Sequence, residues 1–497
     1  MNQEGYIKSV SCLIRNLPNM KKIFSLTIAC GLVVSTNLPL SAEAKDVFVD
    51  ANTVGKAWGS AEGMLQFRGN PTHTRYGEGP VPKNPKVLWK YPRKPMCSSS
   101  VAYGKKKVWC GSGWTGQPVL WIRPDTGQPE IIVGTYNRHV HFINPETGKA
   151  SRPSFPTGDI IKGTVTIDPD GYPLIYFGSR DNKLRIVALD RHKPRKLWSL
   201  DAHAVHPTIW NNDWDGNPSI VNDILIEGGE NGWFFAIQLN RYMDLRGNVR
   251  VNPRRLVQMQ GWNRDLLRKV GDRNVSIENS VAVFENRAYF SNSGGRVLGV
   301  DLSRIKHLRN GKAPIVFDYW VGDDVDASIV IDDEGMLYVA VELERKKKRA
   351  LKLGQLLKLN PYRPRNPLEW GIKVPPKTKK GDGGLWATPA LAGDYLYAVT
   401  HTGRLLVVDR FSGKIVWEDK TLGWHAWSSP NIVDNQLIVA TCNGQIRNYD
   451  LTDPASPERS WTIKLRSEFC IESTPLIWKG KIFVGVRDGY IYAFGDK

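Results

Sequence analysis

The fold is decided by the stretch Trp386-Ala-Thr-Pro-Ala-Leu391, which leads to Tyr395-Leu-Tyr-Ala-Val399 and then to Thr402-Gly-Arg-Leu-Leu-Val-Val-Asp409. Short runs of aliphatic, aromatic and β-branched residues alternate here with Gly and Asp turns, which is typical of antiparallel strands. A fourth run, Lys414-Ile-Val-Trp417, ends on Trp. The unit therefore predicts four short consecutive strands.

The same unit recurs along the chain. Five copies precede this unit, and they begin at Pro118-Val119, Gly163-Thr164, Gly216-Asn217, Asn279-Ser280 and Ala327-Ser328. Two copies follow it, and they begin at Trp427-Ser-Ser-Pro430 and Glu472-Ser-Thr-Pro475. Their starts lie roughly 40–60 residues apart, which is the length of a four-stranded propeller repeat. The sequence predicts an all-β, eight-bladed β-propeller with four-stranded antiparallel blades.

Ring closure is expected at the N-terminal end of the ring. A blade cannot bury both of its faces alone, so the blades must stack in a closed circle. The last unit stops at Asp496-Lys497 without its Trp strand, whereas Lys86-Val-Leu-Trp89 has that pattern. We expect residues 86–89 to complete the last blade. Cys97-Ser-Ser-Ser-Val101, which lies close before the first unit, is either an extra hairpin strand or part of that blade, and the second case leaves seven blades.

Composition excludes several classes of protein. The 497 residues are 41% hydrophobic and 24% charged, with a mean hydropathy of −0.35, which excludes a multi-span membrane protein and a mainly disordered chain. The net charge of +19 suits either a solvated surface or an anionic partner. Basic residues cluster only at Lys105–Lys107, Arg345–Arg349 and Lys377–Lys380. Since no nucleic-acid-binding signature accompanies them, we expect no nucleic-acid partner.

The N-terminus predicts export. Residues 1–44 combine Lys21-Lys22, an apolar stretch and Ser41-Ala-Glu-Ala44, as a secretory signal peptide does, with Met20 as an alternative start. A lipid-attachment site at Cys30 is the rival interpretation. The expected divisions are the signal peptide, an N-terminal extension over 45–85 and the propeller over 86–497. We expect a periplasmic or extracellular monomer without a transmembrane span.

Four cysteines remain after such cleavage: Cys97, Cys110, Cys442 and Cys470. An even number in an exported chain favours disulfides, and four cysteines allow three pairings. Buried free thiols are the alternative.

The turn and strand Asp409-Arg-Phe-Ser-Gly413-Lys-Ile-Val-Trp417 resembles the repeat of propellers related to pyrroloquinoline quinone (PQQ) enzymes. Asn144-Pro-Glu-Thr-Gly148 is a partial copy, and Phe67-Arg-Gly-Asn-Pro-Thr-His-Thr74 looks like the opening of exported members. The resemblance covers about residues 65–497. It implies the propeller fold, with a Trp that docks on the adjacent blade, but it does not fix an activity. The superfamily contains quinoprotein dehydrogenases and a non-enzymatic outer-membrane assembly lipoprotein.

A candidate ligand site is expected where the first strands of the blades surround one mouth of the central channel. Aligned positions of successive units carry Lys162, Asp215, Glu278, Asp326, Trp386, Trp427 and Glu472, and Asp213, Asp324 and His425 lie two residues before three of them. Carboxylates this close repel one another, which favours raised pKa values or a bound metal, with Asp215, Glu278 and Asp326 as candidate ligands. The alternative is a solvated funnel whose acids bond backbone amides.

The sequence leaves two main functions open, with hydrolysis or lyase chemistry by the acidic ring as a weaker third. The first is an exported binding or scaffold module for a protein, polymer or small molecule, with the carboxylate- and Trp-lined funnel as its ligand site. The second, implied by the resemblance, is a dehydrogenase in which PQQ would lie in the funnel with calcium. The adjacent Cys-Cys pair of PQQ alcohol dehydrogenases and a haem-attachment motif are both missing from the sequence. No catalytic residue is assigned.

Overall fold

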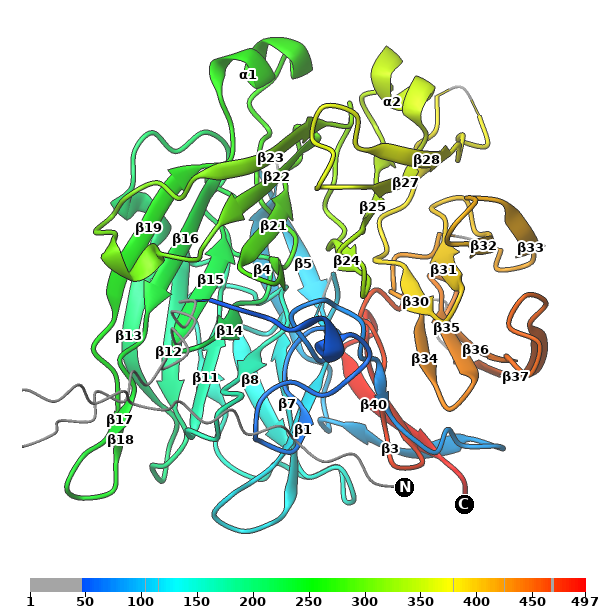
Figure 1. Ribbon diagram of the computed structural model, residues 1–497. Helices are drawn as coiled ribbons and strands as arrows, with labels where there is room; N and C mark the ends of the chain where they lie inside the picture. Colours follow the sequence, from blue (N-terminus) through cyan, green and yellow to red (C-terminus); the bar gives the residue numbers. More distant parts are fainter. Residues whose placement is uncertain (1–46, 103, 115, 379, 424, 466–468) are drawn as a thin grey trace, which may run out of the picture. The chain divides into compact units, whose positions relative to one another are not determined.

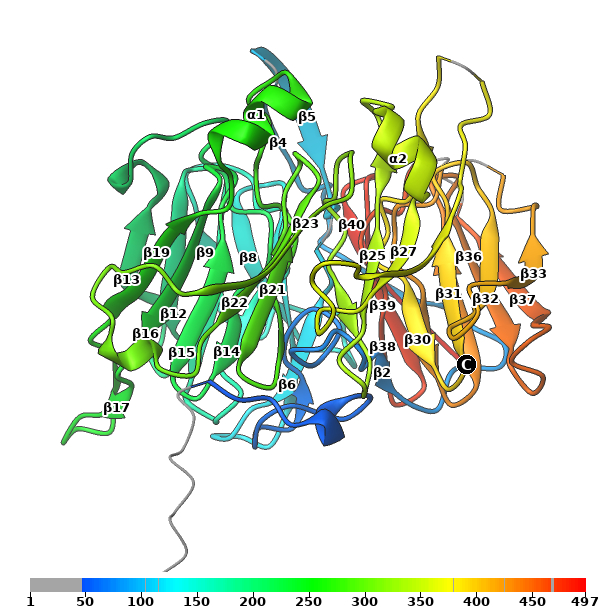
Figure 2. The same ribbon diagram turned by 45° about the horizontal axis from the view of Figure 1, so that its top comes forward.

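Eight four-stranded antiparallel sheets surround a common axis in the computed structural model, which describes residues 47–102, 104–114, 116–378, 380–423, 425–465 and 469–497 (Figures 1 and 2). The predicted eight-bladed propeller is confirmed. The predicted signal peptide and Cys30 lie outside the described residues. Among the residues described, no helix is long and apolar enough to cross a membrane.

Blades 1 to 4 follow one another along the chain, and each runs from an inner to an outer strand. Their strands are β6 (Val119–Ile122), β7 (Pro129–Thr135), β8 (His139–Ile143) and β9 (Phe155–Pro156); β10 (Thr166–Ile167), β11 (Leu174–Phe177), β12 (Lys183–Ala188) and β13 (Arg195–Asp201); β14 (Ser219–Val221), β15 (Ile224–Gly228), β16 (Trp233–Gln238) and β19 (Arg254–Gln260); and β20 (Ala282–Phe284), β21 (Arg287–Ser291), β22 (Arg296–Asp301) and β23 (Ile315–Trp320).

Blades 5 to 8 continue the ring in the same way. Their strands are β24 (Val330–Ile331), β25 (Leu337–Ala340), β27 (Leu356–Leu359) and β28 (Leu368–Ile372); β30 (Ala390–Ala392), β31 (Tyr395–Val399), β32 (Leu405–Asp409) and β33 (Ile415–Asp419); β34 (Asn431–Val433), β35 (Gln436–Ala440), β36 (Gln445–Asp450) and β37 (Glu458–Lys464); and β38 (Leu476–Trp478), β39 (Lys481–Val486), β40 (Tyr490–Gly495) and β3 (Lys86–Tyr91).

Several short strands and helices lie outside the eight four-stranded blades. Strand β1 (Gly63–Met64) extends blade 1 and β2 (Gly77–Glu78) extends blade 8, while three separate pairs are β4 (Cys97–Ala102) with β5 (Lys105–Cys110), β17 (Tyr242–Met243) with β18 (Val249–Arg250), and β26 (Glu342–Leu343) with β29 (Gly383–Gly384). The helices are η1 (Ala51–Thr53), η2 (Ala202–Ala204), α1 (Arg264–Val270), η3 (Ile305–His307) and α2 (Lys348–Leu353). The Cys97 segment is therefore an extra hairpin, and the seven-bladed alternative does not apply.

The N-terminal strand closes the ring as expected. Strand β3 pairs antiparallel with β40, with Trp89 opposite Ala493 and Tyr91 opposite Ile491. The last blade is thus built from both ends of the ring-forming chain, which leaves no blade without two neighbours.

In blades 8 and 5, a Trp on the outer strand packs against the next blade of the ring. The indole Nε1–H of Trp89 donates to the Pro145 carbonyl of blade 1 (2.9 Å), and that of Trp370 donates to the Arg410 carbonyl of blade 6 (3.0 Å). Each ring lies against a glycine of the receiving turn, Gly148 or Gly413, where a Cβ atom would approach the indole to 2.6 Å. This contact explains why the repeat combines a Gly turn in one blade with a Trp in the preceding one.

A belt of hydrogen bonds joins the first strands around the axis. At six junctions the backbone N–H of one blade donates to a side-chain hydroxyl of the next blade; the pairs are Gln117 with Thr164, Asn217 with Ser280, Ser280 with Ser328, Ser328 with Thr388, Thr388 with Ser429, and Ser429 with Thr474, at 2.8–3.3 Å. Side-chain amides join the other two junctions, from Asn217 to Thr166 and from Gln117 to the Pro475 carbonyl. The recurrent Ser, Thr and Asn of the repeat are therefore acceptors and donors of this belt.

The segment between β1 and β2 crosses the opposite end of the ring, where the first strands finish. The carbonyl oxygens of Pro71 and Thr72 accept from the backbone of blades 4 and 5, and the Tyr76 hydroxyl and Leu391 backbone of blade 6 exchange hydrogen bonds. The fully buried Arg68 donates to the Thr388 carbonyl. This segment lies across the far ends of several blades and fastens them together.

Replacing Trp89 with Ala should weaken the ring closure. The change removes an inter-blade hydrogen bond and the packing of the indole on Phe483 and Gly148, so we expect a loss of about 2–4 kcal/mol in the free energy of unfolding. Denaturant unfolding followed by Trp fluorescence measures it. Trp210→Ala, at an exposed indole, is the control, and an equally small effect of both changes would contradict the closure.

Candidate functional site

A cavity of about 800 Å³ opens at the end of the ring where the first strands begin. Seven of the ten residues predicted from the sequence line it, namely Lys162, Glu278, Asp324, Asp326, Trp386, Trp427 and Glu472. Asp213 and Asp215 are buried beneath Lys162, and His425 borders a smaller neighbouring cavity of about 240 Å³. The predicted ring residues are thus brought to one mouth of the propeller.

Lys162 occupies the centre of an acidic group. Its ammonium bonds Asp215, lies 3.3 Å from a Glu230 carboxylate oxygen and lies 3.9 Å from one of Asp213. Burial lowers the pKa of Lys162, but the carboxylates outweigh burial and raise the pKa well above its usual value. Oxygens of Asp213, Asp215 and Glu230 lie within 4.8 Å of one another, so Lys162 supplies the positive charge where a cation would otherwise be needed.

Blades 4 and 5 form an acidic wall, which consists of Glu278, Asp324, Asp326 and Glu342. The Ser293 hydroxyl lies between two members, 3.1 Å from an Asp326 oxygen and 3.4 Å from a Glu278 oxygen. Arg345 is 3.4 Å from Asp324. By contrast, Glu342 is 1% exposed, and its Oε1 has no hydrogen-bond partner among the described residues.

Burial and mutual repulsion favour the protonated forms of the acidic wall. Burial, and then neighbouring carboxylates, raise the pKa values of Glu278, Asp326 and Glu342 well above their usual range. For Asp324, burial raises the pKa to about 8 even though Arg345 opposes this shift. A bound cation would stabilise the ionised carboxylates, so its binding should release protons.

An aromatic wall lines blades 6 and 7. The rings of Trp386 and Trp427 are 6.2 Å apart between centroids, and Trp114 meets Trp427 edge-on at 6.1 Å. Trp386 also contacts His401, whose Nδ1 accepts a hydrogen bond from the indole N–H of Trp427 (3.0 Å). Burial lowers the pKa of His401 to about 3, with His425 adding to the shift, so His401 stays neutral and serves as part of the wall.

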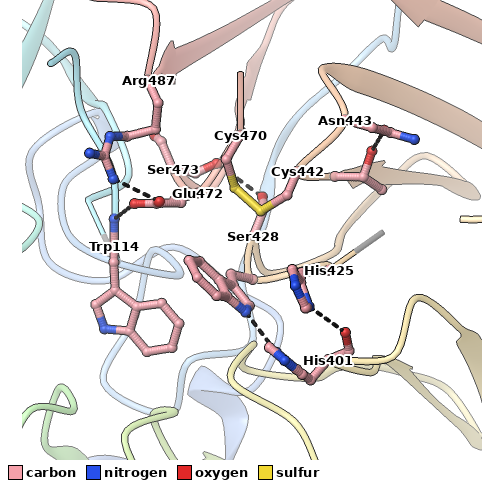
Figure 3. Close-up of a disulfide and its surroundings, with 12 residues drawn as sticks. Trp114, His401, His425, Ser428, Cys442, Asn443, Cys470, Glu472, Ser473 and Arg487 are labelled. Carbon is pink, nitrogen blue, oxygen red and sulfur yellow. Dashed lines mark hydrogen bonds and ion pairs between the residues drawn. A yellow bond between two sulfur atoms is a disulfide. The ribbon is translucent and has the colours of Figure 1, made fainter. Parts of the chain in front are cut away.

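A salt bridge and a disulfide support this aromatic wall (Figure 3). Arg487 pairs with Glu472 at 2.8 Å, and Glu472 accepts from the backbone N–H of Trp114 at 3.3 Å. The Cys442–Cys470 disulfide lies beside them and joins blade 7 to the start of blade 8. The wall is therefore held by contacts from three parts of the chain.

The extra hairpin β4–β5 contributes to the mouth of the cavity. The Cys97–Cys110 disulfide joins its base, and Trp109 packs edge-on against Tyr136 and under Arg487. Val101, Lys107 and Trp109 line the cavity. The two disulfides fix one of the three pairings that the sequence left open.

Sequence alignment of the first strands missed a second set of lining residues. These residues follow the second strand of each blade at one aligned place, and they are Tyr136, Arg180, Glu230, Ser293, Glu342, His401, Cys442 and Arg487. Five of them line the main cavity, including Glu230 and Glu342, and His401 lines the smaller one. The turn between the second and third strands always lies at this mouth, and this regularity would have found them.

Calcium and PQQ make different demands on these residues. Calcium prefers carboxylate oxygens, which the acidic wall offers, but the predicted trio is divided because Asp215 bonds Lys162 while Glu278 and Asp326 flank Ser293. PQQ is a flat quinone that carries carboxylates of its own. Arg180 and Arg487 are already within ion-pair distance of Asp213 and Glu472, so the site fits a cation better than this anionic quinone.

Comparisons with known proteins agree with the fold. The family model described as outer membrane protein assembly factor BamB matches residues 365–495. Sequence comparison with curated proteins finds no match.

Solved structures share the propeller at low sequence identity. BamB from Moraxella catarrhalis is 13% identical, with 83% of this chain and 98% of that chain covered and a TM-score of 0.52. Quinohemoprotein alcohol dehydrogenase from Comamonas testosteroni is 13% identical, with 87% and 80% covered and a TM-score of 0.56. Quinohemoprotein alcohol dehydrogenase ADHIIG from Pseudomonas putida HK5 is 11% identical, with 91% and 83% covered and a TM-score of 0.59.

By its fold, the protein is a β-propeller with eight four-stranded blades. The family model over residues 365–495 and the fold shared with these structures confirm the resemblance to PQQ-like propellers that the repeat indicated.

The buried acids predict a pH-dependent stability. Asp324 has a pKa of about 8 in the folded protein and about 4 when unfolded, so the folded state binds more protons between these values. Stability should therefore fall as the pH rises from about 4 to 8. Asp324→Asn should reduce that fall, as measured by thermal unfolding across this range. The exposed Asp333→Asn is the control, and an unchanged slope for Asp324→Asn would contradict the assignment.

Proposed function

We propose that the protein is an exported, non-enzymatic binding module of the PQQ-like propeller class, whose funnel binds a small organic cation such as an amine. This proposal rests on the pairing of an acidic wall with an aromatic wall in one cavity. An organic cation satisfies both walls, because its charge meets carboxylates and its alkyl groups meet ring faces.

The observation that carries the proposal is the buried carboxylate of Glu342. Strand β26 pairs with β29, with Glu342 opposite Gly384, and this pairing brings the carboxylate next to the strand that leads to Trp386. Both side chains line the cavity. A buried carboxyl oxygen without a hydrogen-bond partner, such as Glu342 Oε1 among the described residues, is costly unless a ligand completes its hydrogen bonding.

The disulfides support export. Cys97–Cys110 and Cys442–Cys470 pair all four cysteines that would remain after cleavage following Ala44. Disulfides persist in oxidising compartments such as the periplasm and the cell exterior. A secretory signal peptide over residues 1–44 agrees with them.

The second candidate function is a PQQ- and calcium-dependent dehydrogenase. The flat faces of Trp386 and Trp427 favour it, as does the fold shared with quinohemoprotein alcohol dehydrogenases. The ion pairs of Lys162, Arg180 and Arg487 with carboxylates favour the binding module, because these cations are already engaged and would not meet the carboxylates of the quinone.

Choline is a direct probe of the proposed cation site, with glucose as the neutral comparison. Calorimetric titration should show choline binding that strengthens as the pH rises toward 8, because Asp324, whose pKa burial raises to about 8, ionises there, with proton release detected in buffers of different ionisation enthalpy. Glu342→Gln should weaken binding roughly 10–100-fold, since a charged partner is lost.

Glu458→Gln removes an exposed carboxylate from the outer strand of blade 7 and should leave choline binding unchanged. Equal binding of glucose and choline, or equal affinity of Glu342→Gln and the parent protein, would reject the cation site.

The dehydrogenase alternative is tested by incubating the protein with PQQ and calcium. We expect neither a bound-quinone absorbance spectrum after gel filtration nor dye-linked oxidation of alcohols, because Lys162, Arg180 and Arg487 are already paired with carboxylates. A retained quinone together with such oxidation would overturn the binding-module proposal in favour of the enzyme.

A further inference from the structure

Basic residues gather on one end of the propeller, around the mouth of the funnel. The basic rim is defined here as residues 104–108, 264–273, 344–352 and 373–382, without residue 379. These 33 residues contain 16 Lys and Arg but four Asp and Glu, which leaves +12 of the chain's net charge of +19. Most of the excess charge is therefore carried by four short segments.

The topology explains why these four segments lie together. Residues 104–108 belong to the hairpin after β3, 264–273 contain α1 and follow β19, and 373–382 follow β28, so each connects an outer strand to the next blade. Residues 344–352 lie between β25 and β27, so they connect the second strand of blade 5 to its third strand. Both types of connection lie at the funnel end, and Figure 2 shows α1, α2 and the β4–β5 hairpin projecting on the same side.

Apolar side chains are exposed on the same projections. Val101 and Val108 are 57% and 71% exposed, and Leu351 of α2 is 46% exposed. In the hairpin register Val101 is opposite Lys106 and Val108 is opposite Ser99, which places both valines and Lys106 on one face. The hairpin and α2 thus present apolar atoms beside positive charge.

We propose that the basic rim docks the protein on an anionic lipid surface. Clusters of Lys and Arg beside exposed aliphatic residues bind such surfaces by charge attraction and shallow insertion of the apolar groups. Eleven of the 16 basic residues are Lys, which protein–protein interfaces disfavour relative to Arg and aromatic residues. Separate projections around a mouth also suit a broad surface rather than one protein groove.

This proposal does not require a ligand in the funnel, and Val101, Lys107 and Val108 of the hairpin lie both at the rim and in the cavity lining. The acidic wall is buried inside the cavity, whereas Lys105, Lys106 and Val108 are exposed at the hairpin. Docking through the rim would turn the mouth of the funnel toward the lipid surface.

Vesicle co-sedimentation of the purified protein tests the proposal. We expect binding to phosphatidylcholine vesicles that contain about 30% phosphatidylglycerol, little binding to phosphatidylcholine alone, and a loss of binding as salt is raised. The triple change Lys105→Gln, Lys106→Gln and Lys107→Gln should weaken partitioning at least roughly tenfold. Thermal unfolding checks that each variant remains folded.

A matched control removes as many positive charges from the opposite end of the propeller. Lys193, Arg195 and Lys196 are exposed where β12 turns into β13, and changing all three to Gln should leave vesicle binding near the parent level. Equal losses in both triple variants would overturn the proposal, because net charge alone would then explain the binding.

A double change of Val101→Ser and Val108→Ser separates lipid from soluble polyanions. It should weaken binding to anionic vesicles but leave retention on a heparin column unchanged, since heparin offers no apolar interior. Failure to bind anionic vesicles, or vesicle binding that is indifferent to the valines, would overturn lipid docking, and the second outcome would assign the rim to a soluble polyanion.

Discussion

The belt of hydrogen bonds around the axis is the constraint on which the rest of this propeller depends. Buried backbone N–H groups near the axis must find acceptors, and the hydroxyls of residues such as Ser328 and Thr388 in the next blade supply them. Each blade is thereby held at a fixed height relative to its neighbours. The residue two places earlier in each first strand consequently reaches the funnel, which is why chemically different side chains converge on one mouth.

That convergence crowds carboxylates together, and the molecule relieves the crowding in two ways. In blades 2 and 3, Lys162 provides a fixed positive charge for Asp213, Asp215 and Glu230. In blades 4 and 5 the raised pKa of Asp324 reflects burial without full compensation, so protons provide the neutralisation. The first arrangement has a cation at its centre, and burial still raises the pKa of Asp213 there to about 7, whereas in the second arrangement burial and neighbouring carboxylates raise the pKa values together.

The closed ring also depends on segments outside the repeats. Strand β3 completes blade 8, and the contact of Trp89 with Gly148 locks that blade to blade 1. The chain between β1 and β2 fastens the far ends of blades 4 to 6 through Pro71, Thr72 and Tyr76. Since these contacts secure the end opposite the funnel, the funnel end is left to loops whose charge and length vary from blade to blade.

The sequence by itself determined the repeat and the closing role of Trp89, because strand alternation, Gly turns and Trp positions are local signals, and it favoured eight blades, which the structure then decided by showing that the Cys97 segment is a separate hairpin. It also identified the first ring of funnel residues, since these share one aligned place. Only the tertiary structure decided that Lys162 pairs with one acidic group and that the separate basic runs form one rim. It also decided that Glu342 lines the same cavity as Trp386, with its Oε1 atom lacking a hydrogen-bond partner among the described residues. The physical reason is that burial and electrostatic neighbours come from different blades, whose spacing in the chain carries no information about distance.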